Sequence, residues 1–163
     1  MAVQEVSKRL QKLVSLHEEL LQISEDKTEY IKKGDMEQLS KLLIQERKQL
    51  QLITQIEADR QQQVEHIFNH LHIDSEDKTV SELLKYVNTE DEKREIEHHV
   101  TALVEIIVKL KQSEQLNNDL LQQSMQFVQF SLDMLQPSMK NMNYNEKSSG
   151  NETVKRSVFD SKA

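Results

Sequence analysis

The sequence predicts an all-α protein in which a long antiparallel helical hairpin, a short third helix and a long C-terminal helix form an elongated bundle. Two observations carry this prediction. Glycine and proline are scarce, with 2 Gly and 1 Pro among 163 residues, whereas sheets and turn-rich folds need these residues at their corners. Apolar residues also recur at intervals of three and four over long stretches, which is typical of helices packed along a narrow seam.

The first helix is predicted over residues 2–33. Its apolar stripe is interrupted by Ser24 and Lys27 before Ile31 resumes it. Lysines in the last turn favour the negative end of the helix dipole, and Gly34 can adopt the left-handed conformation of a C-cap. The helix is therefore expected to end at Gly34. The stripe before the interruption consists of Val3, Val6, Leu10, Leu13, His17 and Leu20.

The second helix is predicted over residues 36–71. Asp35 is expected to cap its N-terminus, with Gln38 at the third helical position. Because Gly34 and Asp35 are adjacent, the chain reverses tightly there and the first two helices form an antiparallel hairpin. The stripe of this helix consists of Leu39, Leu42, Leu43, Leu50, Ile53, Ile56, Glu57, Arg60, Val64, Ile67, Phe68 and Leu71.

Two capping boxes predict the remaining helices. Thr79 and Glu82 open a short helix that ends at Asn88, after a polar connection over residues 72–78. Thr89 and Glu92 open the last helix, predicted over residues 90–136 because the residue before Pro137 disfavours the helical region. Its stripe includes the polar residues Glu114 and Asn117, where we expect a bend or a change of packing partner. The stripe consists of Ile96, Val100, Leu103, Ile107, Leu110, Glu114, Asn117, Leu121, Met125, Val128, Leu132 and Leu135.

The composition changes at Pro137. Ser, Asn and Lys dominate the last residues, where five Lys or Arg stand against three Asp or Glu. This segment is too polar to order itself by burying apolar surface. We therefore predict a helical bundle domain over residues 1–136 and a flexible C-terminal tail over residues 137–163.

The charge and the absence of cysteine exclude several classes of protein. The net charge is −7, and an acidic surface repels the phosphate backbone of nucleic acids. With no cysteine, disulfide scaffolds and thiolate sites are excluded. No apolar stretch is long enough for a signal peptide or a transmembrane helix. The chain is expected to be cytoplasmic and not inserted in a membrane.

Motifs for catalysis and metal binding are incomplete. His66 and His70 are four residues apart, but neither belongs to the zinc-protease pattern, in which Glu follows the first His. Glu95 and His98 form one Glu-x-x-His motif, whereas a di-iron bundle needs two. Neither a serine elbow nor a glycine-rich phosphate loop occurs. We therefore predict a protein that is no enzyme and uses no metal or cofactor.

The end of the last helix and the tail are rich in methionine and other apolar residues. Methionine-rich surfaces adapt to several partner helices, so we predict a partner-binding surface here. The alternative is ordinary core or a dimer interface. The predicted partner-binding residues are Leu116, Leu120, Leu121, Met125, Val128, Leu132, Leu135, Met139, Met142, Tyr144 and Phe159.

Three features resemble one known family. The pattern from Lys33 to Leu39 (KGDMEQL), followed by Leu-rich helix, is similar to the Gly-Asp turn of the FlgN-type flagellar export chaperones. The order of helices also matches that family. The ending from Ser157 to Ala163 (SVFDSKA) is similar to the closing segment of its Bacillus-type members.

The resemblance implies a cytoplasmic chaperone that binds C-terminal helical segments of hook–filament junction proteins, the hook-associated proteins. It would prevent their premature assembly and deliver them to the cytosolic domain of the flagellar export gate. Tyr144 is the nearest match to a tyrosine that contacts the gate in this family. The free protein would be a monomer or a weak homodimer. The alternative function is a self-associating structural coiled coil or adaptor.

Overall fold

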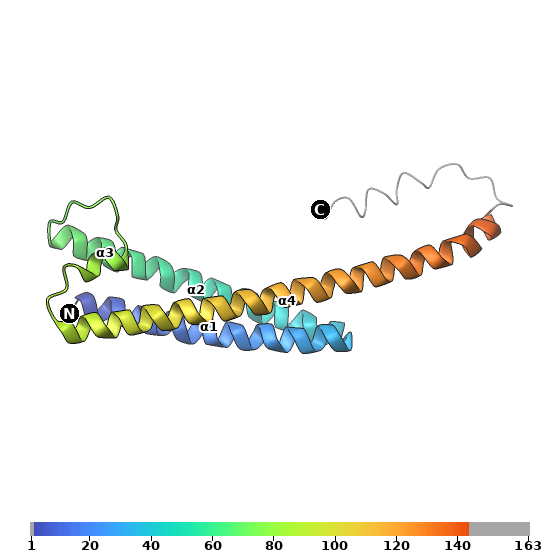
Figure 1. Ribbon diagram of the computed structural model, residues 1–163, viewed down its shortest axis with the longest axis horizontal. Coiled ribbons are helices and arrows are strands. Elements are labelled where there is room, and N and C mark those ends of the chain that lie inside the picture. The colour runs from blue at the N-terminus through green and yellow to red at the C-terminus, as the bar shows by residue number, and fades with distance from the viewer. Residues whose placement is uncertain (1, 144–163) are drawn as a thin grey trace. The chain divides into compact units, whose positions relative to one another are not determined.

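The computed structural model describes residues 2–143, with side chains up to residue 135. All of the regular secondary structure in this part of the chain is helical, so the predicted all-α fold is confirmed. They are α1 (Ala2–Lys33), α2 (Met36–His70), α3 (Val80–Leu84) and α4 (Glu90–Asn143), as Figure 1 shows. The chain divides into two units, one ending at Leu121 and the other beginning at Gln122.

The reversal between α1 and α2 forms where the sequence predicts it. Gly34 has a φ of +69°, a value that glycine adopts without strain. The Asp35 N–H donates to the Tyr30 carbonyl at 3.0 Å and closes the end of α1. The Asp35 carboxylate then accepts from the Gln38 N–H at 3.2 Å and caps α2. The two helices therefore lie antiparallel (Figure 1).

The seam between α1 and α2 is narrow. Leu13 and Leu20 of α1 are buried, as are Leu39 and Leu42 of α2. The predicted α2 stripe is wider than the face that packs. Leu43 and Leu50 each directly follow a buried residue, Leu42 and Gln49, so they are turned about 100° from it around the helix and stay exposed.

A buried polar side chain also lies in this seam. Gln49 Nε2 donates to the Leu16 carbonyl and to Glu19 Oε2, both at 2.9 Å. Both hydrogen bonds compensate for removing the Gln49 amide from water.

A second left-handed residue ends α2. His72 has a φ of +55°, and the Ile73 N–H behind it donates to the Phe68 carbonyl at 3.0 Å. This is a Schellman-type C-cap with histidine where glycine is usual, so the spacing of residues in the sequence does not predict it. Thr79 then caps α3 as predicted, because its side chain accepts from the Glu82 N–H at 3.2 Å. α3 ends at Leu84, earlier than expected.

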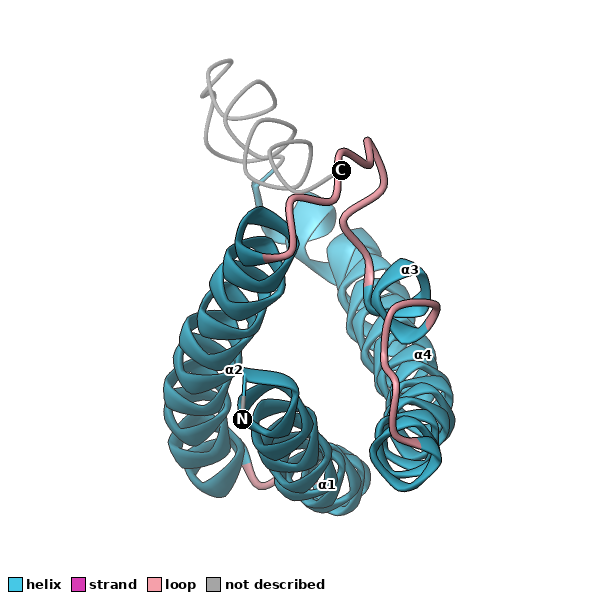
Figure 2. Cartoon of the chain, turned by 90° about the vertical axis from the view of Figure 1, so that its left-hand side faces the viewer, coloured by secondary structure: helices cyan, strands magenta, loops and turns pink. Residues whose placement is uncertain are grey.

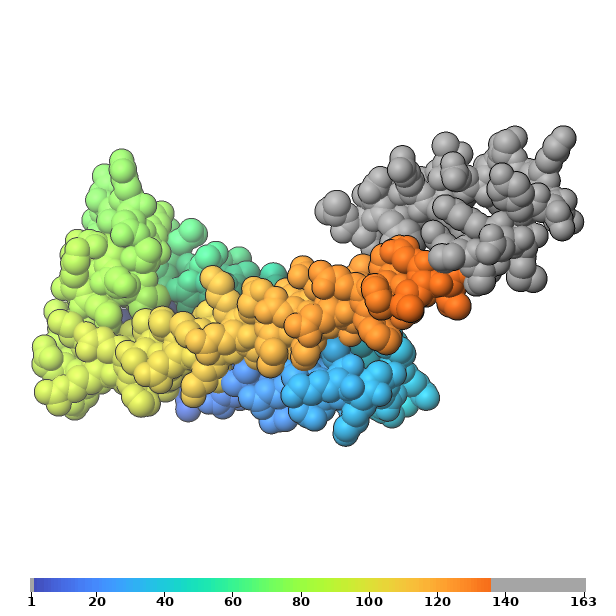
Figure 3. Space-filling view, turned by 45° about the vertical axis from the view of Figure 1, so that its right-hand side comes forward, coloured from blue at the N-terminus to red at the C-terminus, as the bar shows by residue number. Residues whose placement is uncertain are grey.

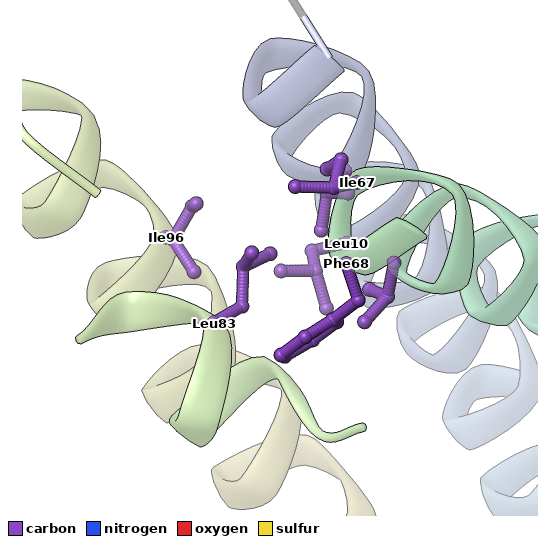
Figure 4. Packing of buried hydrophobic residues seen from close by; sticks show 7 residues of the cluster. Leu10, Ile67, Phe68, Leu83 and Ile96 are labelled. Carbon is purple, nitrogen blue, oxygen red and sulfur yellow. The ribbon is translucent and has the colours of Figure 1, made fainter. Parts of the chain in front are cut away.

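The main apolar core lies at one end of the bundle. It brings together the start of α1, the end of α2, α3 and the start of α4, and Figure 2 shows α3 at this end. Phe68 is fully buried, and its ring meets the edge of Tyr86 with 6.3 Å between centroids. In Figure 4, Leu83 of α3 reaches between Phe68 and Ile96. The buried cluster consists of Val6, Leu10, Val64, Ile67, Phe68, Leu83 and Ile96.

The predicted end of the last helix before Pro137 is wrong. The backbone of α4 remains helical to Asn143. A proline removes one backbone hydrogen bond from a helix and favours a kink, but the turns on either side can still form. The other predicted tail residues, from Tyr144 onward, lie outside the described residues.

We predict that Phe68→Ala destabilises the protein by about 3–5 kcal/mol, because it empties the centre of the core. Phe127→Ala is a matched control, since Phe127 is 70% exposed and Phe68 is 0% exposed. The control should change the unfolding free energy by less than about 0.5 kcal/mol. Urea unfolding followed by circular dichroism measures both. Equal losses would place the core elsewhere.

Candidate partner-binding surface

A buried polar network joins α1 and α4 within the first unit, where the two helices lie side by side (Figure 3). Asn117 is 2% exposed. Its Nδ2 donates to the Ser24 carbonyl at 2.9 Å, and its Oδ1 accepts from the Thr28 hydroxyl. The hydroxyls of Ser24 and Ser113 are 2.7 Å apart. Every polar group of the Asn117 side chain is thereby engaged.

An ion-pair cluster borders this network. The Lys27 ammonium lies 2.7 Å from Glu46 Oε2 of α2 and 3.0 Å from Glu114 Oε1 of α4. Burial alone lowers the pKa of Lys27, but the two paired carboxylates outweigh burial and raise it. Lys27 therefore links three helices through one charge.

The polar residues that interrupt the two predicted apolar stripes contact one another in the structure. Ser24 and Lys27 interrupt the stripe of α1, and Glu114 and Asn117 interrupt the stripe of α4. The structure pairs the four residues with one another. The expected weak point of the last helix is therefore a specific polar contact.

Three predicted partner-binding residues belong to the first unit. Leu116 lines a hollow of about 440 Å³ between α1 and α4, together with Leu21 and Thr28. Leu120 is half-buried and Leu121 is exposed.

The other described candidates lie in the second unit, on residues 122–135, which we call the distal segment. Met125, Val128, Leu132 and Leu135 follow one another at intervals of three and four, so they share one face of the helix. Their side chains are exposed. Met139 and Met142 lie on helical backbone beyond the described side chains, and Tyr144 and Phe159 lie outside the described residues.

A second apolar face of the distal segment was missing from the predicted set. Phe127, Phe130 and Met134 also repeat at intervals of three and four, but they lie about 200° around the helix from the first face. Across both faces, exposed fractions range from 44% at Leu132 to 70% at Phe127. The signal was the second series of apolar spacings, two residues out of phase with the first.

A polar strip separates the two faces on one side. Gln122, Gln126, Gln129 and Asp133 follow one another at intervals of four, three and four. Gln129 Nε2 donates to Asp133 Oδ1 at 3.0 Å. The distal segment therefore offers two apolar faces and one acidic, amide-rich edge, which suits packing against helices rather than chemical catalysis.

Three further observations concern the described part of the chain. It contains no group of three His, Cys, Asp or Glu side chains placed to hold a metal ion. His66 and His70 stack with 6.5 Å between ring centroids. None of the described helices is long and apolar enough to cross a membrane.

Comparisons with known proteins identify relatives. The chain matches the family model described as FlgN protein over residues 1–152. It is similar to YvyG of Bacillus subtilis (strain 168), with 34% identity over 165 residues that cover 100% of both chains. No solved structure matches the chain.

The raised pKa of Lys27 predicts that its ion pairs stabilise the folded protein at neutral pH and that this stabilisation is lost at alkaline pH. The charged form of Lys27 is favoured in the folded protein. Its contribution is therefore complete below the pKa of an unfolded lysine, about 10.4, and disappears as pH rises through the higher folded value. Between pH 9 and pH 11.5, the unfolding free energy of wild type should therefore fall by more than that of Lys27→Met, as measured by urea unfolding. If the difference in unfolding free energy between the two proteins does not change with pH, the pairing of Lys27 with Glu46 and Glu114 is contradicted.

Proposed function

Because the chain belongs to the FlgN protein family, a family of flagellar export chaperones, we propose that it carries hook–filament junction proteins. The family binds hook-associated proteins generally and is not a family of enzymes. In our proposal, the chaperone binds the C-terminal helical segments of these proteins in the cytoplasm and prevents their premature assembly. It then delivers them to the cytosolic domain of the export gate.

The exposed apolar side chains of the distal segment are the observation that supports this proposal. Phe127, Phe130 and Met134 lie on one face, and Met125 and Val128 lie on the other. Contiguous apolar surface of this kind marks interaction sites in soluble proteins. A helical cargo segment can bury its own apolar stripe against either face.

The composition of these faces suits temporary binding. Methionine is flexible and polarizable, so Met125 and Met134 can adapt to cargo side chains of different shape. A cargo segment that folds when it binds loses conformational entropy, which keeps its affinity moderate. Moderate affinity allows the cargo to be handed over.

Delivery is assigned in the same proposal to the end of the chain. Tyr144 and Phe159 carry aromatic rings, which bury a large area with few rotatable bonds. We propose Tyr144 as the contact with the export gate and Phe159 as a further docking residue. Met139 and Met142 would extend the cargo surface.

We predict that Val128→Asp weakens binding of purified junction proteins by at least about tenfold, because it places a charge in an apolar contact. Tyr144→Ala should bind junction proteins normally and yet reduce their export. Isothermal titration measures binding, and secretion of junction proteins from a flagellated strain measures export.

Val104→Asp is the matched control for the binding assay. Val104 lies on α4 in the first unit and is 56% exposed, compared with 55% for Val128. Helical content should be unchanged in both variants. Equal binding by Val128→Asp and wild type would remove the distal segment as the cargo site. A stable wild-type oligomer that Val128→Asp dissociates would instead favour the self-associating adaptor.

A further inference from the structure

A long stretch of the sequence around the distal segment has no basic residue. Residues 112–139 contain no Lys, Arg or His, although the whole chain has 21 Lys or Arg and 6 His. Three acidic residues lie in this stretch, namely Glu114, Asp119 and Asp133. A surface meant for contact with other helices therefore presents only negative and neutral side chains.

The exposed carboxylates of this stretch pair with amides instead of cations. Asp133 Oδ1 accepts from Gln129 Nε2, and Asp119 Oδ1 accepts from Gln115 Nε2, each at 3.0 Å. Both aspartates are exposed. Several carboxylates elsewhere on the described helices do meet a cation one turn away, although Asp26 of α1 also accepts from an amide, that of Gln22. The pairs with a cation are Glu5 with Lys8 and Arg9, Glu57 with Arg60, and Glu82 with Lys85.

The half-buried acidic residue of the stretch, Glu114, is different. Glu114 pairs with Lys27 in the first unit, so its charge is already compensated within the chain. Asp133 has no such neighbour in sequence, since the nearest basic residue is Lys140. A cation supplied from outside would convert a hydrogen bond from a neutral amide into a stronger, charge-assisted one.

The position of Asp133 determines which residues of a partner can reach it. It ends the polar strip between the two apolar faces of the distal segment. A helix packed on either face places its own flanking residues over the edge of that face, as e and g residues do in coiled coils. Those flanking residues, and not the apolar stripe of the partner, meet Asp133.

We propose that the distal segment selects helical partner segments whose apolar stripe is flanked by Lys or Arg, with Asp133 as the main selecting residue. This inference rests on the proposed function and specifies the chemistry of the cargo. A second copy of the chain is a poorer occupant, because the stretch brings no cation to such a pairing and carboxylates would face carboxylates or amides. The charge pattern thus favours a different protein over self-association.

An ion pair with Asp133 would change the affinity for one peptide modestly and the selectivity between basic and acidic peptides more strongly. A single exposed ion pair changes a dissociation constant by roughly two- to fivefold. Salt screens such a pair, so the preference should decrease as ionic strength rises. Like charges at the same place disfavour the wrong partner, which widens the difference between basic and acidic segments.

Three synthetic amphipathic peptides, each about 20 residues long to span the distal segment, test this proposal. They share one apolar stripe and carry Lys, Gln or Glu at the flanking positions. Fluorescence anisotropy measures their binding to the full-length chain. Wild type should bind the Lys peptide most tightly and the Glu peptide least. Asp133→Asn should reduce the preference for Lys over Gln by about two- to fivefold, and Asp133→Lys should reverse the order.

Glu105→Gln is the matched control. Glu105 is an exposed carboxylate on α4 in the first unit, so this variant removes the same charge from another part of the helix. If Glu105→Gln lowers the preference as much as Asp133→Asn does, the peptides respond only to net charge and the proposal is overturned.

Failure of the proposal is distinguishable from failure of the proposed function. If all three peptides bind wild type equally and Val128→Asp weakens each of them, the distal segment binds helices without selecting charge. The proposed function then stands and the inference is overturned. If none of the peptides binds and junction proteins bind Val128→Asp normally, both are overturned.

Discussion

The hydrogen bonds between Asn117 of α4 and Ser24 and Thr28 of α1 determine which turn of one helix faces which turn of the other. Apolar stripes alone tolerate sliding, because one leucine can replace another at the contact. A buried amide does not, since any other register would leave its polar groups without partners. Lys27 adds α2 to the same contact through Glu46. The arrangement of three helices in the first unit therefore depends on one polar site, as a single buried asparagine can specify register in coiled coils.

This constraint also separates two uses of α4. Up to Leu121, the inward face of α4 packs against the core and the polar network. Ile96 and Asn117 on this face are both buried. From Gln122 to residue 135, apolar side chains of the same helix are exposed on two faces. A soluble protein keeps such surface when a partner covers it. Under the proposed chaperone function, the first part of α4 packs within the bundle and the distal segment would bind cargo.

The sequence predicted the features that depend on neighbouring residues. The turn at Gly34, the caps at Asp35 and Thr79 and the first face of the distal segment all follow from local rules. The pairing of Ser24 with Asn117 could not be predicted, because the two residues are 93 positions apart in the chain. Local rules are wrong at Pro137, because the residue before a proline only disfavours the helical conformation and α4 continues to Asn143. They missed His72, whose left-handed conformation the sequence does not signal, and the face containing Phe127, which lies outside the main stripe.

A double-mutant cycle on Thr28 and Asn117 tests the central role of the polar network most directly. Thr28→Val leaves Asn117 Oδ1 buried without its donor, at about 1–3 kcal/mol. After Asn117→Leu the Thr28 hydroxyl still donates to the Ser24 carbonyl at 3.1 Å, so the further loss of this hydroxyl costs less than in wild type. Together they remove both partners of that hydrogen bond. Urea unfolding should therefore show a double variant less destabilised than the sum of the two, with a coupling of about 1–2 kcal/mol. Strictly additive losses would contradict the account, because the two side chains would then stabilise the protein independently.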